Sequence, residues 1–375
     1  MEKKFYVVAF PSVFARRNVP LLMRNIRKAL KAAGMGRAPV GRDGPVITIE
    51  AAEPVMASSA VAQLFGIERV IIARQVKNDF DVAATVIAEV GASLLLKGDR
   101  FLVKVEGEAR GFLPRDLEMA ATSAIIGRSA ERGAGPGTEE DHNRQVYAFL
   151  TKAHAYVSIF SDKGLGGAPH GVHKRTVLCP VFDELSAVSC MAALRQGFDV
   201  RMIMCYSKES ELAWLAKIAN RIIPRTAEEE VELAFYKLGP RRRGRGYPGY
   251  LRTVMNLAGR AAAAAGITHV SLPASPLIIP AEEIDGILGD LDSAGIAAYM
   301  PLGGLEEMEG NAREIGIEGL AGRIGALAWA GPRGSTYDKA RIDSLVDAAL
   351  AGAKSVCVMI GPNNVHDILD GLEGE

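Results

Sequence analysis

The spacing of apolar and polar residues predicts an alternation of strands and helices at the start of the chain. Apolar positions alternate from Phe5 to Phe10 as in a strand, and Pro20 to Ala33 reads as a basic amphipathic helix. We expect a further strand at Val46 to Ile49 and a further helix at Ala57 to Phe65. Residues 1–72 therefore predict a small α+β unit.

A second group of elements follows with a similar pattern. Strands are expected at Arg69 to Gln75, at Phe101 to Glu106 and, as a pair, within Tyr147 to Phe160, and helices at Phe80 to Gly91 and Arg115 to Arg128. Between them, Glu131 to Gln145 is rich in glycine and charge, which is typical of a mobile loop. We place this second α/β domain at residues 73–172.

From Thr176 the pattern changes to strands and helices in strict alternation. Strands are expected at Val177 to Val181, Val200 to Cys205, Ile222 to Pro224, Thr268 to Leu272, Ala297 to Met300, Gly325 to Trp329 and Val356 to Ile360. Helices are expected up to Gln196 and Ile218, near Ala227 to Tyr236 and at Tyr250 to Ala265. Repeated βα units favour a doubly wound parallel sheet, which binds ligands at the carboxyl ends of its strands. This pattern therefore predicts a third domain, at residues 173–375, with a nucleotide-binding type of fold.

Length and composition agree with a modular globular protein. The chain has 375 residues, of which 49% are hydrophobic and 23% charged, and this suits two or three domains. Its 44 basic and 44 acidic residues cancel, so any RNA-binding surface must come from local clusters of charge. The four cysteines are scattered without a CxxC pair, which indicates neither a disulfide framework nor a zinc site.

The chain carries no pattern that indicates export or membrane insertion. The apolar stretch within the first ten residues is too short for a signal peptide, and no run of about 18 apolar residues follows. We therefore expect a cytoplasmic protein without a membrane partner.

Three groups of segments, taken in chain order, carry a family resemblance. They are VFARRNVPLLMRNIRKAL (Val13 to Leu30); LFGIERVIIARQV (Leu64 to Val76), RFLVKVEGEARGFLPRDLEMAATSAII (Arg100 to Ile126) and HAYVSIFSDKGLGGAPHGVHKRTVL (His154 to Leu178); and YMPLGGLEEMEGNAREIGI (Tyr299 to Ile317). In this order they resemble the basic N-terminal helix, the THUMP domain and the late PP-loop segment of the tRNA 4-thiouridine synthetases, a family of tRNA sulfurtransferases. The GLGGAPHG piece is the most specific of them.

The resemblance implies three domains with separate roles. By it, residues 1–72 form a ferredoxin-like domain, residues 73–172 a THUMP RNA-binding domain and residues 173–375 a PP-loop ATPase-like domain, and the partner is tRNA. Relatives form dimers, so a homodimer is an open alternative. Another is a subunit that presents tRNA to a separate catalytic protein.

The phosphate-binding signature of that family, SGGxDS, is degenerate in this chain. In relatives its glycines let backbone N–H groups approach the phosphates of ATP. Counted back from Gly197, the equivalent turn reads VFDELS, which is Val181, Phe182, Asp183, Glu184, Leu185 and Ser186. Phe182 replaces a glycine with a bulky ring, and the carboxylate of Asp183 repels phosphate oxygens. We therefore assign no catalytic residue in this turn.

Two further motifs of the family are altered. The GESLGQ segment corresponds to PASPLI (Pro273 to Ile278), which retains Ser275 but has prolines without the N–H that such a loop donates. GALAWAGPRGST (Gly325 to Thr336) carries Ala328 and Trp329 near the position of the family's sulfur-transfer cysteine. We therefore expect a tRNA-binding pseudo-enzyme without a bound cofactor. The alternative is an active thiolation enzyme with a rebuilt site, which would need ATP and Mg²⁺.

Clustered basic residues are the candidate RNA contacts. Arg16, Arg17, Arg24 and Arg27 lie on or before the first helix, Lys97, Arg100, Arg110 and Arg115 lie in the THUMP-like part, and Arg241, Arg242, Arg243 and Arg245 belong to the run PRRRGRGY. Such side chains neutralise backbone phosphates, and arginine also stacks on bases. Solvated loops and strand edges are the alternative for the second and third groups.

The cysteines and histidines predict no catalytic or metal site. Free cysteines in βα cores mostly behave as small buried apolar residues, and we expect this of Cys179, Cys190 and Cys205. His170 and His173 flank the GLGGAPHG segment and have no acidic or thiol partner at ligand spacing. They are therefore expected to be linker residues.

Overall fold

The computed structural model describes residues 5–239, 247–320, 322, 338–361 and 363–373. Its contacts divide the chain into two compact units, Met1–Gly167 (unit 1) and Ala168–Glu375 (unit 2). Gly166 and Gly167, at the end of unit 1, have φ angles of +64° and +69°, a left-handed conformation that glycine adopts without strain. The expected domain boundaries at residues 72 and 172 stay predictions.

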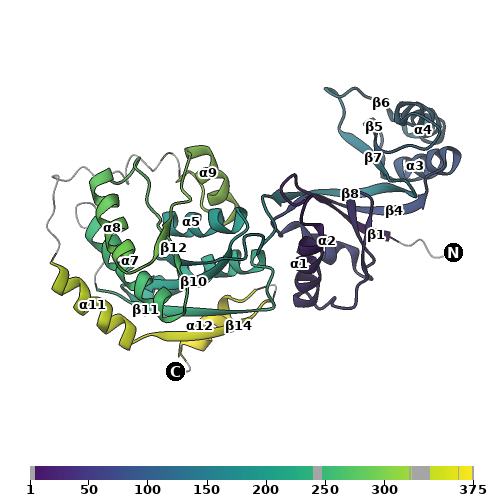
Figure 1. The fold of residues 1–375 in the computed structure, drawn as a ribbon. Helices are drawn as coiled ribbons and strands as arrows, with labels where there is room; N and C mark the ends of the chain where they lie inside the picture. The colour runs from purple at the N-terminus through teal and green to yellow at the C-terminus, as the bar shows by residue number, and fades with distance from the viewer. Residues whose placement is uncertain (1–4, 240–246, 321, 323–337, 362, 374–375) are drawn as a thin grey trace. The chain divides into compact units, whose positions relative to one another are not determined.

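Unit 1 is built on an eight-stranded sheet of order β2-β3-β1-β4-β8-β7-β5-β6. The strands are β1 (Phe5–Pro11), β2 (Val40–Asp43), β3 (Val46–Ile49), β4 (Ile67–Lys77), β5 (Arg100–Gly107), β6 (Gly135–Pro136), β7 (Arg144–Leu150) and β8 (His154–Gly166). Strand β5 runs parallel to β6 and β7, and the other neighbours are antiparallel. The long strands β4 and β8 pair along their length and join the β1–β3 part of the sheet to the β5–β7 part (Figure 1).

The helices of unit 1 are α1 (Val19–Ala32), α2 (Pro54–Ala62), α3 (Phe80–Leu94) and α4 (Pro114–Ser129). Helix α1 buries one stripe that includes Leu22 and Ile26, which leaves its basic residues toward solvent. Helix α2 begins three residues before the predicted start, because Pro54 fits the first turn, where its missing N–H costs nothing. Asp79 caps α3 by accepting the Val82 N–H at 3.2 Å.

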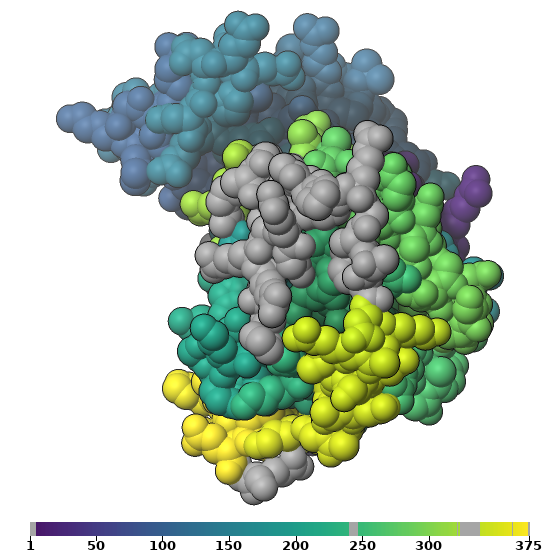
Figure 2. Space-filling model, turned by 90° about the vertical axis from the view of Figure 1, so that its left-hand side faces the viewer, coloured from purple at the N-terminus to yellow at the C-terminus, as the bar shows by residue number. Residues whose placement is uncertain are grey.

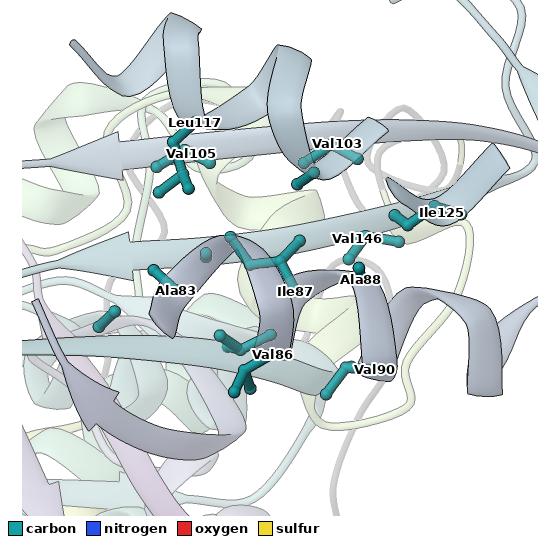
Figure 3. Close-up of a cluster of buried hydrophobic side chains, with 14 of the residues drawn as sticks. Ala83, Val86, Ile87, Ala88, Val90, Val103, Val105, Leu117, Ile125 and Val146 are labelled. Atoms are coloured by element: carbon teal, nitrogen blue, oxygen red, sulfur yellow. The ribbon is translucent and has the colours of Figure 1, made fainter. Parts of the chain in front are cut away.

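The core under α3 and α4 joins apolar side chains from both helices to β5 and β7. Figure 3 shows Ile87, Val103, Ile125 and Val146 together there, each 5% exposed or less. Burial of a side chain of this size contributes about 1.5–3 kcal/mol. Gly91 permits this approach, since a Cβ at this position would lie 2.6 Å from Ile125 Cδ1. A larger residue there would force the two helices apart.

Unit 2 is built on a six-stranded sheet of order β13-β12-β9-β10-β11-β14. The strands are β9 (Thr176–Val181), β10 (Asp199–Tyr206), β11 (Glu230–Lys237), β12 (His269–Ser271), β13 (Ala297–Tyr299) and β14 (Lys354–Met359). The helices are α5 (Glu184–Arg195), α6 (Leu212–Ile222), α7 (Tyr247–Ala264), α8 (Ala281–Ser293), α9 (Leu305–Glu314), α11 (Lys339–Ala351) and α12 (Val365–Glu373). Strands β9 to β13 are parallel, and β14 is an antiparallel edge strand on β11. The predicted α/β fold with a doubly wound sheet is confirmed, except that its last strand runs against the others.

The predicted strand at residues 222–224 and helix at residues 227–236 are wrong. Ile223–Arg225 form a 3₁₀ turn after α6, and residues from Glu230 onward form β11. Ala227 has a φ of +53°, which a right-handed helix excludes. Strand β11 pairs with β10 on one side and β14 on the other, and its Leu233 and Phe235 are buried. This pairing and burial override the helix propensity of the neighbouring Glu and Ala residues. The strand predicted at residues 325–329 lies outside the described residues.

Candidate functional site

The turn after β9 lies where a doubly wound sheet binds its ligands. Strand β9 stands between β10 and β12, so the chain fills the sheet first on one side of β9 and later on the other. Ligands of such sheets bind beyond the carboxyl ends of the strands at this change of direction. Val181 ends β9 and Glu184 begins α5, which places residues 181–186, the turn predicted to be degenerate, at this position.

The turn is hydrogen-bonded to its own side chains. Ser186 Oγ accepts the N–H groups of Phe182 and Asp183, each at 2.8 Å, and donates to the Asp183 carbonyl at 2.8 Å. In return, Asp183 Oδ1 accepts the Ser186 N–H at 2.8 Å, which completes a capping box at the start of α5. Three backbone N–H groups at this helix start, those of Phe182, Asp183 and Ser186, are thus already bonded within the turn.

Two tyrosines of α7 contact the same turn. Tyr247 donates its hydroxyl hydrogen to Asp183 Oδ2 at 2.9 Å. Phe182 is 4% exposed and packs edge to face on Tyr250, with ring centroids 5.7 Å apart. These tyrosines were not among the predicted site residues, although their spacing of three places both on one face of a helix.

The second altered motif, residues 273–278, follows β12, the neighbour of β9. Ser275 is 1% exposed, and its carbonyl accepts the Ile278 N–H at 2.9 Å in a tight local turn. Ser189 of α5 and Ser271 of β12 share a buried hydrogen bond of 2.7 Å. The two motifs therefore follow the carboxyl ends of neighbouring parallel strands, and Ser186 and Ser275 are both buried.

Three cysteines of unit 2, Cys190, Cys205 and Cys357, have thiols whose pKa is raised. Cys179, Cys190 and Cys205 are buried, as expected from the sequence. The hydrogen bond with Cys179, together with burial, raises the pKa of the Cys190 thiol well above its usual value, and burial raises the pKa of Cys205. Cys357 is exposed, but its hydrogen bond to Glu230 Oε1 at 2.7 Å raises its pKa as well. A neutral thiol is a poor nucleophile.

Unit 1 contains a cavity of ≈ 840 Å³ that the sequence analysis did not predict. Its wall comes from β1, the start of α1, the β2–β3 hairpin and strands β4, β5, β7 and β8. Apolar side chains in this wall include Phe10, Val46 and Phe149. The basic lining residues are Arg16, Arg42, Arg69 and Lys163, and the acidic ones are Glu68, Glu106 and Asp162.

An arginine that rests on two aromatic rings lies at this cavity. The guanidinium carbon of Arg69 is 4.4 Å from the ring centroid of Phe10 and 4.2 Å from that of Tyr147. Arg69 donates to the Tyr147 hydroxyl at 2.5 Å and pairs with Glu106 at 3.4 Å, and Tyr147 donates to Glu106 at 2.8 Å. Burial opposes ionisation of Glu106, but the bond from Tyr147 and the charge of Arg69 outweigh it and lower its pKa. Arg69 and Glu106 therefore form a paired donor and acceptor beside the rings.

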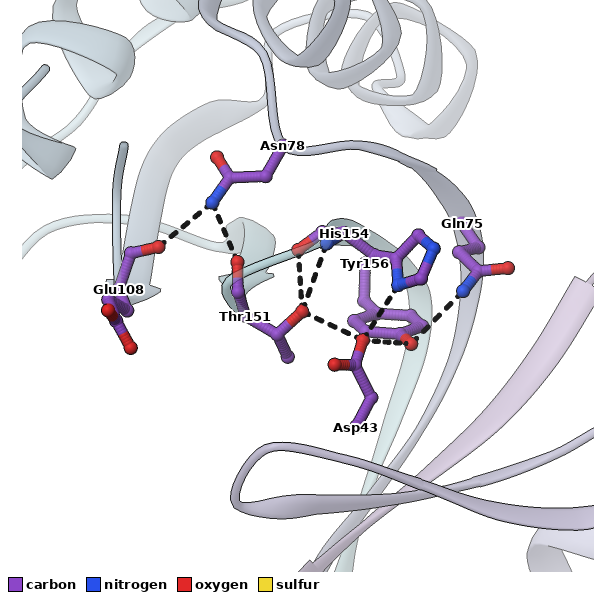
Figure 4. Close-up of polar contacts among 7 residues, drawn as sticks. All are labelled: Asp43, Gln75, Asn78, Glu108, Thr151, His154 and Tyr156. Atoms are coloured by element: carbon purple, nitrogen blue, oxygen red, sulfur yellow. Dashed lines mark hydrogen bonds and ion pairs between the residues drawn. The ribbon is translucent and has the colours of Figure 1, made fainter. Parts of the chain in front are cut away.

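A hydrogen-bond cluster around Asp43 holds the β2–β3 hairpin (Figure 4). Asp43 Oδ2 accepts hydrogen bonds from His154 Nδ1 at 2.8 Å, from Thr151 Oγ1 at 2.7 Å and from the Tyr156 hydroxyl at 2.7 Å. Burial opposes ionisation of this carboxyl, but these bonds, that of His154 first, outweigh it and lower the pKa of Asp43. Burial and the bond to Asp43 raise the pKa of Tyr156, which stays a donor.

The Asp43 cluster fixes one wall of the cavity. Arg42 precedes Asp43, and Pro45 and Val46 follow it, and all three line the cavity. Gly44 has a φ of +59°, so Asp43 and Gly44 form the Asp-Gly pair that favours a tight hairpin. This pair was the sequence signal for β2, which the sequence analysis missed.

The basic residues predicted in unit 1 all reach the surface. Exposed side chains are found at Arg16, Arg17, Arg24, Arg27, Lys97, Arg100, Arg110 and Arg115. Arg27 donates to the Val40 carbonyl at 3.1 Å, and Arg100 pairs with Asp141 at 3.1 Å. Of the eight, Arg16 lines the cavity.

Strand β5 separates the basic residues of the THUMP-like part into two pairs. Lys97 and Arg100 lie at its start, whereas Arg110 and Arg115 follow its end. Eight extended residues span roughly 25 Å, so these four side chains do not form one compact patch. Arg110 and Arg115 lie at the end of β5 that carries Glu106. Arg241, Arg242, Arg243 and Arg245 lie outside the described residues.

The histidines of the GLGGAPHG segment have partners from elsewhere in unit 2. His170 is 7% exposed and lies 3.4 Å from Asp199 Oδ1. His173 Nε2 lies 2.9 Å from the Gln196 carbonyl, and its ring stacks on Phe198. Within the described part of the chain, no three His, Cys, Asp or Glu side chains gather as metal ligands. No described helix combines the length and the apolar character that a bilayer crossing requires.

Comparison with known proteins gives relatives in sequence and in fold. No family model matches the chain. Over 187 residues it is 24% identical to a probable tRNA sulfurtransferase of Methanosarcina mazei, a match that covers 49% of this chain and 46% of that protein. The chain thus spans about half the length of the curated relative.

Two solved structures share the fold over most of the chain. One is the crystal structure of a 4-thiouridine synthetase–RNA complex with bound ATP, with a TM-score of 0.69 and 14% identity, covering 95% of this chain and 100% of that one. The other is PH1313 from Pyrococcus horikoshii Ot3, with a TM-score of 0.61 and 14% identity, covering 84% of this chain and 99% of that one. Both share the fold of this chain over the parts that they cover. Figure 2 shows one face of the chain as a space-filling view.

Proposed function

We propose that this chain binds tRNA through unit 1 and has no adenylation activity in unit 2. Its similarity to a probable tRNA sulfurtransferase and to the fold of a 4-thiouridine synthetase supports this proposal. The observation that carries the proposal is the turn at residues 181–186, whose N–H groups bond to Ser186 and Asp183. The choice of RNA as the partner rests on the resemblance, because the solved structure of similar fold is an RNA complex. Unit 2 then serves as a scaffold or docking surface.

The turn after β9 does not fit the triphosphate that the family binds. A phosphate there would compete with Ser186 Oγ for the N–H groups of Phe182 and Asp183, which are bonded at 2.8 Å. It would also approach the carboxylate of Asp183, and two anions repel strongly in a partly buried site. The ring of Phe182, packed on Tyr250, fills space where a glycine would leave room. Adenylation by the family's chemistry is therefore unsupported by these residues.

The basic residues of unit 1 suit a folded RNA. Exposed arginines and lysines neutralise backbone phosphates without reading sequence, so they position a structured RNA by its shape. Arg16 lies beside the cavity, and Arg110 and Arg115 lie beyond the carboxyl end of β5, which contributes Glu106 to the same cavity. We therefore assign the main RNA contact to this end of unit 1.

Calorimetry with Mg·ATP tests the part of the proposal that concerns unit 2. We expect no saturable heat from the full chain at millimolar nucleotide, because the turn offers its N–H groups to its own side chains. The same preparation must bind tRNA, which shows that the protein is folded. Saturable heat with ATP, or incorporation of sulfur into tRNA by the purified chain, would overturn the proposal.

The salt dependence of tRNA binding tests the part that concerns unit 1. We expect the affinity to fall steeply with salt, and the double variant R110A/R115A to lower the slope of log K against log salt by about 1 for each phosphate that it no longer neutralises. The variant R128A removes an exposed charge from the end of α4 and is the matched control. An equal slope in all three proteins would remove Arg110 and Arg115 from the interface.

A further inference from the structure

We propose that the cavity in unit 1 binds a single unpaired nucleotide, with its base beside Phe10 and Arg69 and its phosphate at the rim. The inference rests on the proposed function and goes further, since it names a pocket and a ligand class for the RNA-binding unit. It also extends beyond the surface arginines, which do not read a base.

The charged groups beside the aromatic rings select a planar heterocycle over a bare anion. Arg69 carries N–H donors, and Glu106, 3.4 Å away, carries acceptor oxygens. Glu106 stays ionised because the bond from Tyr147 and the charge of Arg69 lower its pKa, so it repels a phosphate in this place. A nucleobase edge, by contrast, presents both acceptors and donors, and arginine recognises it together with carboxylates.

The aromatic residues give the base a surface on which to pack. Phe10 meets Phe149 edge to face, with centroids 4.9 Å apart, and both rings are half-buried and line the cavity. Stacking on aromatic or guanidinium planes is the usual way in which proteins hold an unpaired base. The volume of ≈ 840 Å³ lies within the roughly 300–1,000 Å³ of sites for small organic ligands.

The rim supplies charge for one phosphate rather than for a duplex backbone. Arg16, Arg42 and Lys163 line the cavity and are exposed, so they reach a phosphate at its mouth. Glu68 and Asp162 lie on the same lining and offset part of this charge. The balance leaves the lining with an excess of one positive charge, which suits a single nucleotide and disfavours a run of phosphates.

The Asp43 cluster preorganises the wall that carries Arg42. Three donors on one carboxylate oxygen hold the hairpin tip in place before any ligand arrives. Arg42 Nε also donates to the Gly44 carbonyl at 2.8 Å, which directs its side chain. A wall that is fixed in advance lowers the entropy cost of binding.

Binding of short RNA and of mononucleotides to the full chain tests the inference. We would measure fluorescence anisotropy of labelled single-stranded tetranucleotides of each base, with the four nucleoside monophosphates as competitors. We expect the tetranucleotide of one base to bind best, and the rim variant R42A/K163A to lower the affinity for that tetranucleotide about tenfold. We expect E106Q, which keeps the shape but replaces one of the two acceptor oxygens by an NH₂ donor, to change the preferred base. R128A, away from the cavity, should change neither.

The outcomes separate this inference from the proposed function. If tRNA binds with its steep salt dependence but R42A/K163A and E106Q leave tetranucleotide affinity and base preference unchanged, the cavity is not the site and only the inference fails. If tRNA does not bind but a mononucleotide does, and E106Q alters its preference, the cavity binds a free nucleotide and the proposed function fails. Absence of binding by tRNA, tetranucleotides and mononucleotides overturns both. Hydrogen exchange of each variant, matched to the parent, confirms that the fold is intact.

Discussion

The turn at residues 181–186 in unit 2 and the cavity of unit 1 both contain bonded polar groups, but they differ in the space around these groups. In the turn, Ser186 and Asp183 bond to the N–H groups around them, and Tyr247 covers the remaining carboxylate oxygen. In the cavity, Arg69 and Glu106 also pair, yet both line an open space of ≈ 840 Å³. Each bonded backbone N–H of the turn has a single hydrogen, so it gains little from a ligand, because the exchange breaks as many bonds as it makes, whereas the Arg69 guanidinium has five N–H donors.

This difference separates the two places where a ligand could bind. The turn of unit 2 lies where doubly wound sheets bind ligands, but it is bonded to its own side chains. Unit 1 keeps exposed arginines and a cavity whose wall is fixed by the Asp43 cluster. We therefore expect variants of the turn to change mainly stability, and variants of the cavity to change mainly binding.

The largest expected effect comes from Ser186→Ala. It leaves the N–H groups of Phe182 and Asp183 without their acceptor, which we expect to lower the free energy of unfolding of unit 2 by about 3 kcal/mol. Both tryptophans of the chain, Trp214 and Trp329, belong to unit 2, so urea unfolding followed by tryptophan fluorescence reports on this unit.

The matched control for Ser186→Ala is Ser293→Ala. Ser293 Oγ donates to the Gly289 carbonyl at 2.7 Å on an exposed part of α8, so its loss should change stability by less than about 0.5 kcal/mol. Equal stability of the Ser186 and Ser293 variants would mean that the turn is not held by its own side chains, and the contrast with the cavity would disappear.

A smaller effect is expected from Asp43→Ala in unit 1. The variant removes the acceptor of His154, Thr151 and Tyr156, and we expect the free energy of local opening of residues 40–49 to fall by about 2 kcal/mol. Amide hydrogen exchange of the hairpin measures this. Asp141→Ala, which removes an exposed pair with Arg100, is the control and should have no measurable effect. Unaltered exchange at residues 40–49 would refute the role given to the Asp43 cluster.

The smallest effect is the response of the same hairpin to acid. The pKa of Asp43 is lower in the folded protein than in the unfolded chain, so its contribution is complete above the unfolded value of about 3.9 and is lost as pH falls through the folded value. We expect protection of residues 40–49 to decline below about pH 4, and Asp43→Asn to flatten this decline. A decline of equal steepness in Asp43→Asn would assign the acid response to other groups.

The sequence predicted the strands and helices whose structure is set by residues close to them along the chain. Alternation of apolar positions was enough for strands such as Val46–Ile49, and it failed at Glu230–Lys237, where pairing with two other strands decides the structure. It also could not show that β14 runs antiparallel, because apolar alternation is the same in both strand directions.

The candidate sites show the same limit. Asp183 and Ser186 are three apart at the start of a helix, a local capping pattern that the sequence displays, whereas the contact of Asp183 with Tyr247 crosses 64 residues. The cavity was not predictable, because Phe10, Arg69 and Phe149 come from three strands and meet only through the order of the sheet. The exposure of the basic residues could be predicted from their charge. Their separation into pairs at the two ends of β5 could be seen only in the structure.

Hydrogen exchange of the full chain alone, with Mg·ATP and with tRNA tests the contrast between the two units most directly. We predict that tRNA slows exchange in the strands around the cavity, including residues 40–49 and 67–77, and that millimolar Mg·ATP leaves exchange at residues 181–187 unchanged. Protection of residues 181–187 by ATP, without protection of unit 1 by tRNA, would contradict the account.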